Sequence, residues 1–330
     1  MREELIFALS VEDSNGIRHN VPNASYEKWE INSLGFKGRE FDLEKKEGQV
    51  RVVCLGSSES FGKYESKDKE WPSQLGEKLR DLFPRVEVIN ASVVGLKYER
   101  TKDYVEKYLL PLKPDVLILF QRFLIFVRHS MREREGKYAQ ERRVKSTVKL
   151  YRLHIRTLPK LEETIERCLP GWLLIHIRLW TLRSKLRRKV KKYLINKEPL
   201  GEVPGNIILE FEKHLSIFID YLKENHIVPV LSTFPTLITP LNKDMHKNIL
   251  MESRRHCIEL SKDGIVDAYI KFNDAIRRIA KEQNLVFIDN DQLVPKTLEY
   301  FGDNYHFTDK GAELIAENFY NTLNRSHLLK

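Results

Sequence analysis

Short apolar runs alternate with amphipathic stretches along most of the chain. Runs rich in β-branched and bulky apolar residues, bounded by glycine, proline or polar residues, are typical of buried strands. Five such runs occupy residues 51–56, 86–89, 116–120, 227–233 and 285–289. Apolar residues at helical spacing predict helices at 71–83, 98–110, 208–222, 266–280 and 309–323. The alternation predicts βαβ units, and hence an α/β fold with about five parallel strands and helices on both faces of the sheet.

The pattern is interrupted at two places. Residues 1–50 are polar with few periodic apolar positions, and they predict an extended N-terminal arm with glycine turns lying across the domain that follows. Residues 125–204 are basic and contain Pro159 and Pro170. We therefore expect one α/β domain built from 51–124 and 205–330, with a basic helical insertion between its third and fourth strands.

The composition and the N-terminal residues also indicate a cellular compartment. The 330 residues are 42% hydrophobic and carry a net charge of +9, as expected of a folded chain of moderate basicity. The three cysteines are odd in number and lack metal-ligand spacing, which favours a reducing compartment. The acidic N-terminus does not resemble a secretory signal, and no run of about 20 apolar residues occurs. These features predict a cytoplasmic protein without a bound metal.

The positive charge belongs mainly to the insertion. Residues 128–197 hold 21 Lys or Arg against six Glu, an excess larger than the net charge of the whole chain. Within it, 172–192 combines two tryptophans with a cationic tail, which is typical of a helix lying on an anionic membrane surface. A lid over the active site, or an oligomer contact, is the alternative. Nucleic acid is less favoured, because no recognition fold accompanies the charge. The membrane interpretation places the protein peripherally on the inner membrane face.

The first candidate for chemistry is Ser58. It follows the first predicted strand directly, after Gly56 and Ser57, so its hydroxyl is expected at the carboxyl edge of the sheet, where open α/β folds bind ligands. Ser58 is therefore a candidate nucleophile. The competing interpretation is a Ser/Gly-rich turn that caps the next helix.

The second candidate is the pair Asp303 and His306, which precedes the last predicted helix. A carboxylate three residues before an imidazole can orient it while the other ring nitrogen faces a nucleophile. The competing interpretation is a capping loop, with Thr308 as the cap of the helix. Asp289, at the end of the fifth strand, is interpreted as a turn cap. The remaining histidines that we considered are interpreted as surface or structural residues: His129, His154, His176, His214, His226, His246 and His256.

Together these motifs resemble the SGNH, or GDSL-type, hydrolase family. Its first block is matched by Gly56-Ser57-Ser58 and by Gly62, with Ser57 in place of the usual aspartate. Its second block is matched by Asn90 to Gly95, and its last block by Asp303-x-x-His306. The arm segment 32–38 is similar to the lead-in of bacterial members associated with surface polysaccharide and lipid modification. The resemblance covers about 30–124 and 205–325.

The resemblance implies a three-layer flavodoxin-like fold and a site that uses no cofactor. Ser58 would be the nucleophile, His306 the general base and Asp303 the residue that orients it. The backbone amides of Ser58 and Gly95 would form the oxyanion hole.

The third block of the family is divergent. It normally supplies an asparagine whose amide donates to the oxyanion, and Leu124 stands at that position here. Leucine has no donor. Gln121 and Arg122 are the nearby polar residues that could replace it.

These inferences lead to two functional hypotheses. The first is a serine esterase or acyltransferase that acts on O-acyl groups, for example O-acetyl groups, of bacterial glycans or lipids through an acyl-Ser58 intermediate. The second, favoured by Leu124 and by the basic insertion, is a non-catalytic SGNH-like binding or scaffold protein at the membrane surface. The sequence leaves the oligomeric state open.

Overall fold

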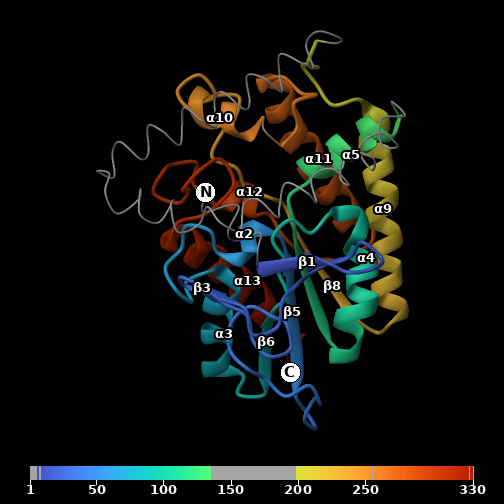
Figure 1. Cartoon of the computed structure of the whole chain (residues 1–330), viewed down its shortest axis with the longest axis vertical. Coiled ribbons are helices and arrows are strands. Elements are labelled where there is room, and N and C mark those ends of the chain that lie inside the picture. The colour runs from blue at the N-terminus through green and yellow to red at the C-terminus, as the bar shows by residue number, and fades with distance from the viewer. Residues whose placement is uncertain (1–5, 7–8, 135–197, 255, 327, 330) are drawn as a thin grey trace, which may run out of the picture.

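A five-stranded parallel sheet forms the centre of the molecule (Figure 1). The computed structural model describes residues 6, 9–134, 198–254, 256–326 and 328–329. The strands are β5 (Val50–Gly56), β6 (Val86–Asn90), β7 (Val116–Phe120), β8 (Val228–Ser232) and β9 (Val286–Ile288). Their spatial order is β6-β5-β7-β8-β9. All five predicted strands are present within one or two residues of the expected bounds, and the order is flavodoxin-like, with its switch point beside β5.

Helices cover both faces of the sheet. They are α2 (Ser58–Phe61), α3 (Trp71–Leu82), α4 (Thr101–Tyr104), α5 (Leu124–Arg134), α9 (Gly205–Glu224), α10 (Lys247–Ser253), α11 (Lys262–Glu282), α12 (Asn290–Leu293) and α13 (Asp309–Arg325). The helices α3 and α13 pack together on one face. The helix α9 packs on β8 and against α11 on the other, where α4 also lies in Figure 1. The predicted α/β architecture with helices on both faces is therefore confirmed.

Aromatic side chains fill the space on both sides of the sheet. On one face Trp71 stacks on Phe319 at a centroid distance of 4.7 Å and meets Phe120 edge-on. On the other, Phe211 packs edge-on against Phe123 and Phe272, each at 4.7 Å. Pairs of this kind add roughly 0.5–1.5 kcal/mol each beyond the burial of their area. The rigid core fixes the carboxyl ends of the strands.

The N-terminal arm is more structured than the sequence pattern indicates. It contains two antiparallel hairpins, formed by β1 (Ser10–Glu12) with β2 (Arg18–Asn20) and by β3 (Ser25–Tyr26) with β4 (Trp29–Glu30). The indole of Trp29 is 2% exposed, and its Nε1 donates to the Gly62 carbonyl at 2.6 Å. These two-residue and three-residue strands are too short to show an alternating pattern, which explains why only an extended arm was expected.

The helix predicted at 98–110 is replaced by an irregular series of turns. Tyr98–Arg100 is a 3₁₀ turn, α4 follows it, Val105–Leu109 winds as a π-helix, and Leu110–Leu112 is again 3₁₀. Pro111 lacks an N–H group and cannot donate to the carbonyl of Lys107, so a regular helix cannot continue through it.

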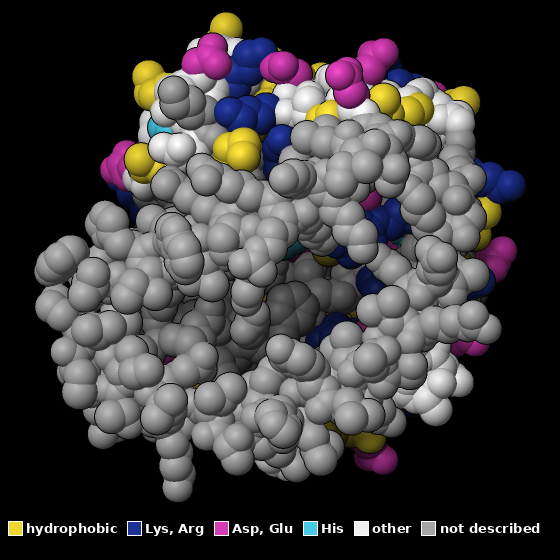
Figure 2. All heavy atoms as spheres, turned by 45° about the horizontal axis from the view of Figure 1, so that its top comes forward, with side chains coloured by type: hydrophobic (Ala, Val, Ile, Leu, Met, Phe, Trp, Pro, Cys, Tyr) yellow, Lys and Arg dark blue, Asp and Glu magenta, His cyan; other side chains and the backbone are white. Residues whose placement is uncertain are grey.

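The predicted insertion is only partly within the described residues. Its first residues form α5, which packs on α9 and α11, and its last residues join the domain through a backbone bridge between Leu200 and Leu260. The membrane-surface or lid segment 172–192 lies outside the described residues. In the part of the chain that the structure describes, no helix has both the length and the apolar character needed to cross a bilayer. Figure 2 shows hydrophobic, basic and acidic side chains interspersed over the described part of one end of the molecule.

Candidate active site

Ser58 lies immediately beyond the end of β5. The strand is paired with β7 in a register that sets Gly56 opposite Phe120. A Cβ atom at Gly56 would lie 2.6 Å from the Phe120 carbonyl oxygen and 2.2 Å from the Ser60 hydroxyl, so only glycine fits at this turn. The chain then enters α2 at Ser58. The backbone therefore presents Ser58 at the carboxyl edge of the sheet, as the sequence predicts.

The loop between β9 and α13 brings an imidazole to this serine. The Nε2 atom of His306 lies 2.9 Å from Ser58 Oγ, and its Nδ1 lies 2.8 Å from Asp303 Oδ2. His306 and Asp303 are 3% and 6% exposed. The three sequence candidates, 248 residues apart at their extremes, thus form one chain of hydrogen bonds.

The carboxylate of Asp303 accepts hydrogen bonds from other donors in addition to the His306 ring. Its Oδ1 accepts from the backbone N–H groups of Tyr305 and His306, and its Oδ2 lies 3.2 Å from both Lys63 Nζ and the Tyr64 hydroxyl. Neither Lys63 nor Tyr64 was identified from the sequence, because each follows Gly62 in a loop with no distinctive spacing.

These contacts set the protonation states. Burial opposes the charged form of Asp303, yet the charge and hydrogen bond of His306 and the charge of Lys63 hold the pKa of Asp303 well below its usual range. Burial is the largest cause that lowers the pKa of His306; together with the charges of Lys63 and Arg122, and against the opposing effect of Asp303, it brings this pKa to about 4. At neutral pH the imidazole is neutral and the carboxylate ionised. Nδ1–H must then donate to Asp303, which leaves Nε2 to accept the Ser58 proton.

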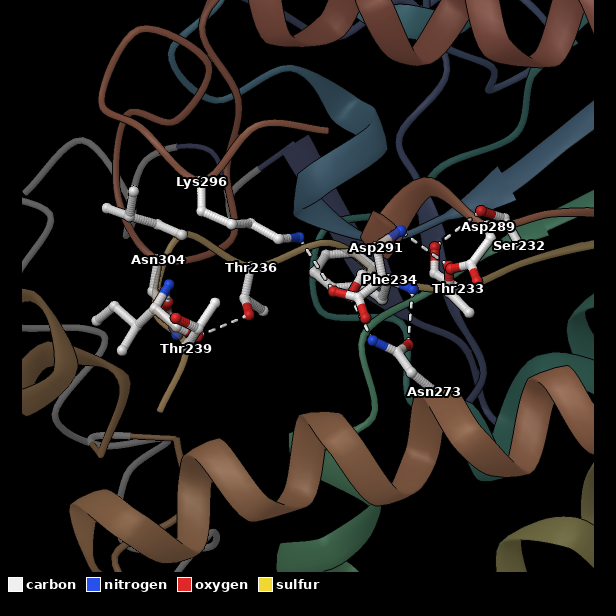
Figure 3. A network of polar contacts seen from close by, with 12 residues as sticks. Ser232, Thr233, Phe234, Thr236, Thr239, Asn273, Asp289, Asp291, Lys296 and Asn304 are labelled. Atoms are coloured by element: carbon white, nitrogen blue, oxygen red, sulfur yellow. Dashed lines mark hydrogen bonds and ion pairs between the residues drawn. The ribbon is translucent and has the colours of Figure 1, made fainter. Parts of the chain in front are cut away.

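A second polar network fixes the position of this loop (Figure 3). Asn304 accepts through its Oδ1 from the Ile238 N–H at 3.0 Å and through its backbone carbonyl from the Leu237 N–H at 2.9 Å. The segment after β8 is itself held to α11, because Asn273 both accepts from and donates to the backbone of Phe234. The loop that holds Asp303 and His306 is therefore tied to α11 through a defined series of bonds.

In this region the capping role of Thr308 is confirmed, whereas Asp289 precedes α12 without a side-chain capping hydrogen bond. The Thr308 side chain accepts from the Gly311 N–H and caps α13. The Asp289 carboxylate accepts from Thr233 and Arg277, so it holds the end of β9 to its neighbours rather than facing Ser58.

The residues expected to stabilise an oxyanion differ in their availability. Gly95 has a φ of +79°, and its N–H donates to the Ser57 hydroxyl at 3.2 Å. Gln121 is engaged at both ends of its amide, with the Leu96 carbonyl and the Thr101 hydroxyl. Leu124 is 1% exposed and packs in the core. Arg122 is 6% exposed and lines the pocket at Ser58, whereas Gln121 does not.

A pocket of about 60 Å³ opens at Ser58. Besides Ser58, its wall is formed by residues from six segments of the chain. They are Ile6, Ser57, Phe61, Lys63, Val94, Gly95, Arg122, Ile125, His256 and His306. His256, interpreted from the sequence as a surface or structural residue, is therefore at the pocket wall. Ile6 comes from the arm, whose contribution could not be read from its sequence because pocket walls carry no periodic signal.

At the pocket a hydroxyl, an imidazole and a carboxylate are joined in series by hydrogen bonds. Among the residues that the structure describes, no group of three or more His, Cys, Asp or Glu side chains is arranged to hold a metal ion. A neutral imidazole between a serine hydroxyl and a buried carboxylate is the arrangement that activates serine for attack on a carbonyl carbon.

Comparisons with known proteins give a likeness in structure only. No family model matches the chain, and no curated protein sequence is significantly similar. Solved structures with an overall likeness include a protein assigned to the G-D-S-L family of lipolytic proteins from Desulfitobacterium hafniense (14% identity, 83% of this chain and 100% of the other, TM-score 0.45). Two others are the lipase/acylhydrolase of Enterococcus faecalis (14%, 84% and 97%, 0.47) and an acetylxylan esterase of Geobacillus stearothermophilus (12%, 85% and 96%, 0.46). Likeness at this level does not indicate an activity.

Proposed function

We propose that the protein is an SGNH-type serine esterase or acyltransferase that acts on short O-acyl groups. The observation that carries the proposal is the hydrogen-bonded chain from Ser58 through His306 to Asp303, which opens into a pocket. A turn cap would need neither the imidazole beside the serine nor the additional donors on Asp303. The arrangement matches what nucleophilic catalysis by serine requires.

The reaction would proceed in two steps. Ser58 Oγ attacks the ester carbonyl carbon while His306 Nε2 takes the hydroxyl proton, and the carbonyl π electrons move onto the oxygen. When the tetrahedral intermediate collapses, the bond to the alcohol breaks and His306 protonates the leaving oxygen. An acyl-Ser58 ester remains. Water or an acceptor hydroxyl then attacks it in the same way, and His306 again transfers the proton.

Backbone donors would stabilise the negative oxygen. By the resemblance to the family, the Ser58 and Gly95 amides would be the first two donors, and Gly95 lies in the pocket wall. Its N–H now points to the Ser57 hydroxyl, so this donor would be shared with the substrate or released to it. Removal of one donor of an oxyanion hole typically costs about 100- to 1000-fold in kcat, or roughly 3–4 kcal/mol.

The substrate class follows from the dimensions of the pocket. Sites that enclose drug-sized ligands usually measure about 300–1,000 Å³, and the pocket at Ser58 measures about 60 Å³. This supports an acyl group as short as acetyl, with the alcohol part of the ester remaining outside. The resemblance of the arm to bacterial polysaccharide- and lipid-modifying members supports a glycan or lipid as that alcohol.

An assay with p-nitrophenyl acetate tests the proposal. We expect wild type to release p-nitrophenol at a rate that Ser58→Ala and His306→Ala reduce by at least 1000-fold, with their thermal unfolding midpoints preserved. Equal rates for wild type and Ser58→Ala would refute the assignment of Ser58. In that case the non-catalytic scaffold hypothesis would be favoured.

A further inference from the structure

The proposed oxyanion hole has two backbone donors but lacks the third donor, which is a side chain in the family. Leu124, at the position of the family's asparagine, has no polar atom in its side chain, and it is 1% exposed in the core. Gln121 uses its amide nitrogen on the Leu96 carbonyl and its amide oxygen on the Thr101 hydroxyl. Neither Leu124 nor Gln121 lines the pocket at Ser58, so neither is placed to reach a negatively charged oxygen there.

Arg122 lies where such a donor is needed. The register between β5 and β7 pairs Gly56 with Phe120. Two residues beyond this pair, the chains reach Ser58 on one side and Arg122 on the other, and both line the same pocket. Adjacent parallel strands are about 4.8 Å apart. The backbone therefore brings Arg122 to the same edge of the sheet as the nucleophile, one strand away.

The guanidinium is held in place but is not saturated by hydrogen bonds. Its Cζ atom lies 3.9 Å from the centre of the ring of Tyr305, and Tyr305 is the residue directly before His306 in the chain. The side chain is 6% exposed, and its Nε and Nη1 atoms have no hydrogen-bond partner among the described residues. A buried donor without a partner carries a free-energy cost, which is larger when the donor is charged. Such a cost is expected where a ligand supplies the missing acceptor.

The buried acid Glu59 interacts with the charge of Arg122. Burial raises the pKa of Glu59, and the charge of Arg122 opposes this only in part. Glu59 already accepts from the Ser57 N–H through Oε1, and its Oε2 has no partner in the described part of the chain. Arg122 keeps its positive charge, because a guanidinium is not deprotonated in proteins.

We propose that Arg122 is the third donor of the oxyanion hole and takes the place of the missing asparagine. This inference rests on the proposed esterase function. The N–H groups of Arg122 would donate to the carbonyl oxygen, which is neutral in the bound ester and carries a full negative charge in the tetrahedral intermediate. A cation gains far more from the second state than from the first, so its contribution falls on the transition state.

Recognition of an anionic substituent on the substrate is the competing role for the N–H groups of Arg122 that are unpaired among the described residues. A pocket of about 60 Å³ accommodates the reacting carbonyl and a short acyl chain, and it leaves little room for an additional carboxylate or phosphate beside them. The contact of the guanidinium with the face of the Tyr305 ring also limits its movement, as a pre-organised oxyanion donor requires.

Steady-state kinetics with p-nitrophenyl acetate, a neutral ester, separate these roles. We expect Arg122→Met to lower kcat by about 100- to 1000-fold with KM within about threefold. Arg122→Ala should recover at least tenfold of its kcat when guanidinium ions are added at millimolar concentrations. The control is Arg100→Met, whose arginine is 44% exposed and pairs with Asp103 on a surface turn; it should keep wild-type kinetics.

Several results would overturn the proposal. The first is a wild-type kcat in Arg122→Met, and the second is a rise in KM alone in that variant. The third is a loss of kcat in Ser57→Ala that Arg122→Met does not show, because that result would assign the donor to the Ser57 hydroxyl. If the methionine variant does not fold, Arg122→Ala decides: recovery of its kcat with added guanidinium supports the proposal, and wild-type kcat without guanidinium refutes it. Failure of the esterase function itself is distinct, because wild type would then match Ser58→Ala.

Discussion

Removal of the Lys63 charge should shift the pH dependence of the site. Lys63 Nζ and His306 Nδ1 lie 3.2 and 2.8 Å from the same oxygen of Asp303, so they are separated by at most about 6 Å. Two unit charges at about 6 Å interact by roughly 3 kcal/mol at an effective dielectric constant of about 20. That energy corresponds to about two pKa units. Screening is limited, because the side chain of Lys63 is 9% exposed.

The sign of the shift follows from the cations around the imidazole. Lys63 disfavours the imidazolium and contributes to lowering the pKa of His306 from 6.5 to about 4. Lys63→Met removes this repulsion, so the pKa of His306 should rise by about one to two units. Because only the neutral imidazole accepts the Ser58 proton, the acid limb of kcat/KM should move from about pH 4 toward about pH 5–6. The rate near pH 8 should change little.

Two readouts test this shift independently. The first is the pH profile of kcat/KM for p-nitrophenyl acetate, with Lys63→Arg as the charge-preserving control, which should keep the wild-type limb. The second is NMR titration of the His306 ring protons, which needs no catalysis. An unchanged limb and an unchanged imidazole titration in Lys63→Met would refute the electrostatic reasoning, and so would a shift of equal size in Lys63→Arg.

Three further predictions concern stability and specificity. Burial raises the pKa of Glu65 from 4.5 to about 8, so the stability that its bound proton contributes is complete below pH 4.5 and is lost as the pH rises through 8. In wild type the unfolding free energy should therefore fall by up to about 1.4 kcal/mol per pH unit in this range, and Glu65→Gln should remove that fall. Urea titration at several pH values would measure the difference. Gly56→Ala should destabilise the fold by about 1–3 kcal/mol in thermal unfolding and impair catalysis, because its Cβ clashes with the Phe120 carbonyl. Acetyl esters should exceed octanoyl esters in kcat/KM by tenfold or more, as competition assays would measure, because the pocket is small.

The sequence predicts most of the architecture because strand and helix periodicities are local signals. It also identifies Ser58, Asp303 and His306, because each lies next to a strand or helix end that the pattern marks. The structure then shows the Ser58 hydroxyl and the His306 imidazole within hydrogen-bond distance, a fact that depends on tertiary packing across the whole chain.

Other parts of the site leave no such signal. Lys63 reaches Asp303 from a loop 240 residues earlier in the chain, and only the folded structure brings the two together. Ile6 and His256 line the pocket, but the pattern of residues around them in the sequence does not predict that they form part of its wall. The sequence left Gln121 and Arg122 equivalent as replacements for the asparagine, and the difference between them emerges from hydrogen-bond partners.

Labelling with a fluorophosphonate tests most directly the claim that His306 activates Ser58 as a nucleophile. The reagent phosphonylates a serine hydroxyl only when a base removes its proton, and intact mass followed by peptide mapping locates the adduct. We predict one adduct per chain on Ser58 in wild type, and a labelling rate lower by at least 100-fold in His306→Ala. No adduct, an adduct at another residue, or equal labelling rates in wild type and His306→Ala would contradict the account.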